Sequence, residues 1–92
     1  MPTATQDDIN NYVLGSLHMP LNDRRHLEAM VILHYDVPDK KANEMVGKAL
    51  IKSLEYYRHL EAKQMNEIRS TQHMIAMLEN WTPELNEEVN NG

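Results

Sequence analysis

Apolar residues recur every three or four positions along most of the chain, which is the spacing of helices that each bury one face. The pattern predicts three main helices, over about residues 6–18, 23–35 and 38–80, and a short helical segment after them. We therefore expect an all-α fold, a small helical bundle or hairpin in which residues 1–92 form a single domain.

Capping residues mark the ends of the first two predicted helices. Thr5 and Asp8 have the spacing of a capping box, with Thr5 before the first helical residue and Asp8 at its third position. Pro20 prevents the first helix from continuing. Either Asn22 or Asp23 then caps the second helix through its side-chain oxygen.

The third helix is the longest predicted element. It follows a turn at residues 36–38, in which Asp36 can act as a cap, and then continues without a proline and with one glycine. As one unbroken helix it would be about 60 Å long, at 1.5 Å per residue. Gly47 could permit a kink near its start, and the polar stretch 59–71 is where we expect a bend.

The first two helices are too short to cover this long helix. Each is about 20 Å long, so together they can cover residues 42–60 but not the apolar positions beyond. Leaving such side chains in water would cost roughly 1.5–3 kcal/mol for each one. We expect a symmetric dimer first, then folding back of the C-terminal segment with Trp81, Leu85 and Val89 as cover, and then docking on another protein.

The expected protein interface is the apolar stripe in the C-terminal half of the long helix. It comprises Met65, Ile68, Met74, Ile75, Met77, Leu78 and Trp81. Tryptophan and tyrosine are common interface anchors. Tyr56 and Tyr57 cannot share one helix face, so at least one should be exposed or at an interface. The seven methionines are interpreted as core filling, with an adaptable binding surface as the alternative.

The net charge of −5 comes from the two ends of the chain. Residues 1–20 and 80–92 carry acids and no lysine or arginine, whereas acids and bases balance between them. The whole chain therefore lacks the basic footprint of a nucleic-acid-binding protein. No cysteine is present, no apolar run approaches the roughly 20 residues of a membrane span, and the N-terminus is polar. We expect a soluble, cytoplasmic protein with no membrane contact.

The residues that could perform chemistry do not form a recognisable site. The serines lie within predicted helices, the three glycines form no phosphate loop, and the five histidines include no pair at i, i+4. Glu55 and His59 share a helix face, but zinc needs at least three protein ligands. We predict no enzyme, no cofactor and no metal site, while a site at His34 shared across a dimer stays open.

Basic residues recur along one face of the long helix and in the first turn of the second. The simpler interpretation of the long-helix face is a solvated surface balanced by nearby glutamates. Positive charge in a first turn is mildly unfavourable, and we favour a tolerant surface over a specific contact for Arg24 and Arg25. The candidates for nucleic-acid or anion contact are Arg24, Arg25, Lys41, Lys48, Lys52 and Lys63.

Residues 21–54 faintly resemble the helix-turn-helix of sigma-factor region 4 and related phage antitermination regulators. Residues 19–25 and Tyr35 echo the opening of that motif, whereas Lys48 and Ser53 stand where it has apolar residues. The resemblance covers about a third of the chain and does not establish membership. It implies DNA binding as an alternative function.

The expected function is that of a non-enzymatic small helical regulator, adaptor or inhibitor that acts by protein–protein binding. We expect a homodimer and a larger protein partner, such as a nucleic-acid-handling machine whose basic surface meets the acidic ends. The alternative is a helix-turn-helix-like DNA-binding transcription regulator that uses Arg24, Arg25, Lys40, Lys41, Lys48 and Lys52.

Overall fold

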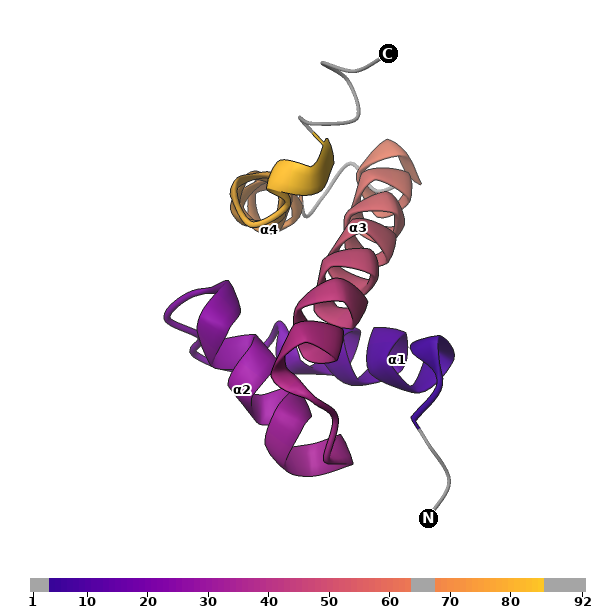
Figure 1. Cartoon of the computed structure of the whole chain (residues 1–92). Helices are drawn as coiled ribbons and strands as arrows, with labels where there is room; N and C mark the ends of the chain where they lie inside the picture. Colours follow the sequence, from indigo (N-terminus) through magenta and orange to yellow (C-terminus); the bar gives the residue numbers. More distant parts are fainter. Residues whose placement is uncertain (1–3, 64–67, 86–92) are drawn as a thin grey trace.

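The computed structural model describes residues 4–63 and 68–85. These residues form the helices α1 (Gln6–Ser16), α2 (Arg24–Tyr35), α3 (Asp39–Lys63) and α4 (Ile68–Asn80), shown in Figure 1. No strand occurs within the two described ranges. The expected all-α bundle is therefore confirmed.

The helices α1 and α2 both pack against the N-terminal half of α3 (Figure 1). Their apolar faces meet in one core, as the three-and-four spacing requires. Its fully or nearly fully buried side chains are Ile9, Val13, Leu17, Leu27, Val31, Val37, Ala42, Met45, Val46, Ala49, Leu50, Leu54, Tyr57 and Leu78.

The prediction of one helix over residues 38–80 is wrong. α3 ends at Lys63, inside the polar stretch where a bend was expected, and α4 begins at Ile68. α4 lies beside the C-terminal half of α3 and packs against it (Figure 1). Leu78 is fully buried in the same core as Leu50 and Leu54. A single straight helix would have left this leucine in water, so folding back supplies cover that α1 and α2 cannot reach.

The predicted caps of the first two helices are confirmed. The Thr5 hydroxyl accepts a 3.1 Å hydrogen bond from the Asp8 amide, and the Thr5 amide donates a 3.1 Å bond to the Asp8 carboxylate. Asp23, rather than Asn22, caps α2 by accepting a 2.9 Å bond from the amide of His26. The first helix ends at Ser16, two residues before the predicted end.

The turn between α2 and α3 depends on Asp36. It has a left-handed backbone, with φ of 55°, and is the one non-glycine residue with positive φ in the described ranges. Its amide donates a 2.8 Å bond to the carbonyl of Ile32 and so ends α2. The carbonyl of Pro38 then accepts a 2.8 Å bond from the Ala42 amide, which starts α3.

The chain after α4 turns at Thr82. Its hydroxyl donates a 2.8 Å bond to the carbonyl of Leu78 and closes the last turn of α4. The backbone is helical again over residues 83–85. The predicted cover residue Val89 lies outside the described residues. In the described part of the chain, each helix is too short or too polar to cross a membrane.

Candidate functional site

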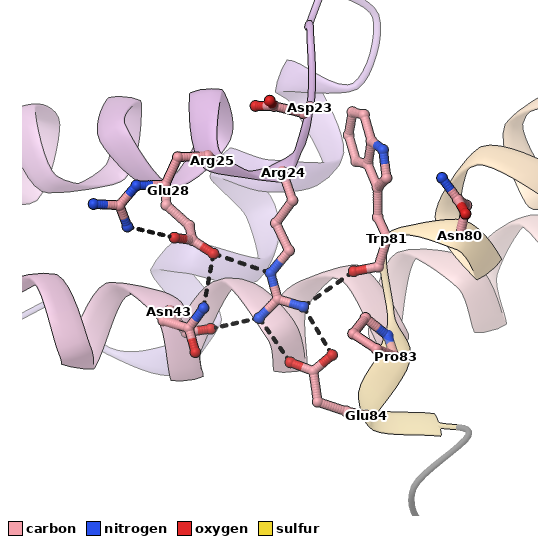
Figure 2. Close-up of a pocket in the computed structure, with 9 residues that line it drawn as sticks. All are labelled: Asp23, Arg24, Arg25, Glu28, Asn43, Asn80, Trp81, Pro83 and Glu84. Carbon is pink, nitrogen blue, oxygen red and sulfur yellow. Dashed lines mark hydrogen bonds and ion pairs between the residues drawn. The ribbon is translucent and has the colours of Figure 1, made fainter.

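Arg24 joins three parts of the molecule that are distant in sequence. Its side chain extends from the first turn of α2 to α3 and to residues 81–85, which we call the segment after α4 (Figure 2). Nη1 and Nη2 donate to the two carboxylate oxygens of Glu84 at 2.8 and 2.7 Å, which is the bidentate geometry of a strong charge-assisted pair. The same nitrogens also donate to the carbonyls of Trp81 and Asn43, at 3.0 and 2.9 Å.

Glu28 supplies the second carboxylate of this cluster. It accepts a 3.0 Å bond from Nε of Arg24, a 2.9 Å bond from Arg25 and a 2.9 Å bond from the Asn43 side-chain amide. Its side chain is only 4% exposed, and that of Arg24 is 14% exposed. A buried carboxylate without partners would be costly. No buried side-chain nitrogen or oxygen in the described ranges lacks a hydrogen-bond partner.

The charges in this cluster stabilise one another. Hydrogen bonds from Arg24 lower the pKa of Glu84, and burial opposes this effect. The hydrogen bond to Glu84 likewise raises the pKa of Arg24, again against the effect of burial. The pair is therefore ionised at neutral pH.

Gly47 makes room for this ion pair on the surface of α3. A Cβ atom at this position would lie 2.5 Å from Oε2 of Glu84 and 2.9 Å from Nη2 of Arg24. Either distance is a steric overlap, so any larger residue would push the two side chains away. The suggestion of a kink at Gly47 is not needed, because α3 is continuous through this residue.

An open cavity of about 780 Å³ lies beside the ion pair. One side of the cavity is formed by the interacting residues described above, which we call the Arg24 cluster: Arg24, Arg25, Glu28, Asn43 and Glu84. The rest of the lining consists of Asp23, Asn80, Trp81 and Pro83 (Figure 2). We call this cavity the Arg24 groove. Its lining comes from α2, α3, α4 and the segment after α4, so it exists only because α4 folds back.

Sequence reasoning placed Arg24 and Arg25 on a tolerant surface, which is wrong for Arg24. Arg25 also forms ion pairs, at 2.9 Å with Glu28 and 3.0 Å with Asp39, although its side chain is 65% exposed. The signal was present in the sequence. Glu28 follows the arginines by four and three positions, which is the spacing of ion pairs on one helix face.

The remaining basic candidates lie on α3. Lys40, Lys41, Lys48, Lys52 and Lys63 are all exposed. The structure thus separates the predicted set: the lysines face solvent, whereas the two arginines have carboxylate partners within the chain.

The predicted protein interface is only partly on the surface. Leu78 is fully buried, while the other placed side chains are half-buried against the core. Met65 and the side chain of Ile68 lie outside the described part of the structure. The half-buried members, which we call the α4 rim, are Met74, Ile75, Met77 and Trp81.

A smaller cavity of about 380 Å³ lies between α1 and α3. Its lining includes Leu14 from α1 and Lys52, Tyr56 and His59 from α3. Tyr56 is 49% exposed whereas Tyr57 is buried, as expected for neighbours that cannot share one face.

The histidines are dispersed over the described surface. His34 stacks on Tyr12 with ring centroids 4.8 Å apart and makes an edge contact with Tyr35. Across residues 4–63 and 68–85, no three acidic or histidine side chains are grouped as a metal site would require.

The chain was compared with protein-family models, with curated proteins and with solved structures, and no significant match was found in any of the three. The fold and the site define a small all-α domain with a partly buried ion-pair cluster. Its function has to be argued from these features alone.

Proposed function

We propose that this chain is a non-enzymatic regulator or adaptor that acts by protein–protein binding and associates with itself through the α4 rim. The observation that carries the proposal is the incomplete burial of the α4 rim. Met74, Ile75, Met77 and Trp81 pack on the core but keep part of their apolar surface in solvent. Apolar surface that several side chains of one helix leave in solvent is a feature of interaction sites.

The residue types of the α4 rim suit a binding surface. Methionine is flexible and adapts to different partner shapes, and tryptophan is among the residues that contribute most to interface affinity. A two-fold axis beside α4 would bring two identical rims together, as in most homodimers. Burial of Leu78 within the monomer leaves a smaller surface than the sequence suggested, which favours a reversible dimer.

A larger protein is the second proposed partner. The acidic ends of the chain would suit a basic surface, such as that of a nucleic-acid-handling protein, by electrostatic complementarity. The cytoplasm is the proposed location, and a chain without cysteine is compatible with its reducing environment.

The solution mass tests self-association. Light scattering over a range of concentrations should show a mass that rises from 10.7 kDa, the mass of one chain, toward twice that value. Met77→Glu should weaken the dimer at least about tenfold, since a charge would be buried in the interface.

Ala76→Glu is the matched control, because Ala76 lies on the exposed face of the same helix. It should leave the dissociation constant unchanged. A mass of one chain at every concentration would remove the homodimer from the proposal.

DNA binding is the alternative, and the exposed lysines of α3 are the feature that supports it. Lys41, Lys48 and Lys52 could contact phosphates, whereas Arg24 is largely buried and paired with Glu84. Such binding should weaken steeply with salt. A gel-shift experiment at low salt that shows no retardation of duplex DNA would exclude this alternative.

A further inference from the structure

We propose that the Arg24 groove is a carboxylate-binding site that the chain occupies with its own Glu84, and that an acidic segment of a partner protein replaces Glu84 there. This inference rests on the proposed protein-binding function and gives the chemistry of the partner segment that enters the groove, which is separate from the basic surface proposed to meet the acidic ends of the chain. The segment after α4 is then an autoinhibitory ligand.

The receptor half of the site is complete without Glu84. Nε of Arg24 donates a hydrogen bond to Glu28, and Nη2 donates one to the carbonyl of Asn43. Asn43 in turn donates to Glu28, so α2 and α3 together orient the guanidinium. The side chain of Arg24 is 14% exposed and that of Glu84 is 37% exposed. The pair therefore consists of a largely buried, oriented guanidinium and a more accessible carboxylate.

The site has a shape suited to a carboxylate. Gly47 leaves the space into which the Glu84 oxygens and the guanidinium fit, close to the backbone of α3. The adjoining cavity of about 780 Å³ is larger than its internal occupant. Ligand sites commonly measure about 300–1,000 Å³. Pro83 lies beside the ion pair, and the indole of Trp81 points away from it (Figure 2); both line the groove and offer apolar surface on which a peptide could pack.

Glu84 supplies the second carboxylate partner of Arg24. Without Glu84, the guanidinium of Arg24 would pair only with Glu28, which also accepts a bond from Arg25, while Arg25 has Asp39 as a further partner. An incoming carboxylate would restore the two charge-assisted bonds that Glu84 makes with Arg24. Asp23 and Glu28 also line the groove and would repel a dianion. This favours a glutamate or aspartate side chain over a phosphate group.

Glu84 competes with any partner because it is tethered to the site. A tethered ligand has an effective concentration on the order of millimolar, which masks weaker ligands in solution. A partner segment must therefore bind with additional contacts in the groove, or the hold of Glu84 must be weakened. Removing the charge of Glu84 should expose the site.

Peptide binding to full-length variants tests the inference. The probe is a fluorescent, blocked peptide with the sequence Thr-Pro-Glu-Leu, which reproduces residues 82–85 and is the one segment known to fit. In fluorescence anisotropy, Glu84→Gln should bind it at least about tenfold more tightly than the wild-type chain does. The same peptide with glutamine in place of glutamate should not bind.

Two further variants separate the site from general effects. Glu79→Gln removes a different carboxylate, one that pairs with Arg58 at 2.7 Å on the exposed surface, and should bind like the wild type. Adding Gly47→Ala to Glu84→Gln should weaken binding, because the methyl group displaces the carboxylate and the end of the Arg24 side chain from their present positions. Circular dichroism establishes that each variant is folded.

Equal binding by the wild type and a folded Glu84→Gln variant would overturn the proposal, as would no binding to either. Displacement of the peptide by millimolar inorganic phosphate would overturn the preference for a carboxylate. Light scattering on the same samples measures self-association through the α4 rim separately. A monomeric chain that still binds the peptide would refute the homodimer and leave this inference standing.

Discussion

Arg24 and Gly47 show how much of the site is decided by single residues. Arginine suits Arg24's position because one planar guanidinium reaches Glu28, Glu84 and two backbone carbonyls at once. Gly47 contributes by what it lacks, since a methyl group would overlap the ion pair. The two residues lie on different helices, and the glycine at position 47 leaves the space that the ion pair of Arg24 occupies.

Substituting the two helical glycines with alanine should give opposite results. Gly15 has no atom within 4 Å of an added Cβ, so Gly15→Ala should raise the free energy of unfolding by roughly 0.5–1 kcal/mol. Gly47→Ala gains the same helix propensity but disrupts the bonds between Arg24 and Glu84. We expect a net loss of about 1 kcal/mol. Urea denaturation measures both, and equal stabilisation by the two variants would contradict the structure.

At the scale of elements, the division of the long apolar segment into α3 and α4 determines the fold. The periodicity and the polar stretch at residues 59–71 predicted helix on both sides and a bend between them. They did not predict that α4 would return to the core. That depends on the free energy gained where Leu78 meets the surface of α3, which no local pattern encodes.

Two neighbouring residues of α4 test this arrangement. Leu78→Ala should lower the free energy of unfolding by about 2–5 kcal/mol, because it leaves a cavity in the core. Met77→Ala should cost roughly 1 kcal/mol, since that side chain is half-exposed and buries less area. Urea denaturation followed by circular dichroism gives both values. Similar small losses for the two variants would show that α4 does not join the core.

At the scale of the whole molecule, contacts between distant segments hold the helices in place. Arg24 and Glu84 are 60 residues apart, and the side-chain amide of Gln6 reaches the carbonyl of Met45 at 2.9 Å. The ion pair of Arg58 with Glu79 adds little, because both side chains are 52% exposed. The Arg24 cluster is thus the main polar connection between α2, α3 and the segment after α4.

The pH dependence of unfolding should report this connection. Because the folded pKa of Glu84 lies below its ordinary value of 4.5, the stability that it contributes is complete above that value. This contribution is lost as the pH falls through the lowered pKa. Glu84→Gln does not titrate, so the wild type should exceed it in stability at neutral pH and converge on it in acid. A difference that stays constant into acid would be inconsistent with the ion pair.

The sequence by itself determined the helices and most of their ends. Thr5, Asp8 and Asp23 act on amides within three residues, and apolar spacing defines each buried face over a few turns, so these signals are local. Only the tertiary structure decided that α4 folds back, that the largely buried Arg24 is the centre of an ion-pair cluster, and that Gly47 accommodates this cluster. Those features arise where surfaces from distant parts of the chain meet, and their free energy depends on the burial and charge of both partners.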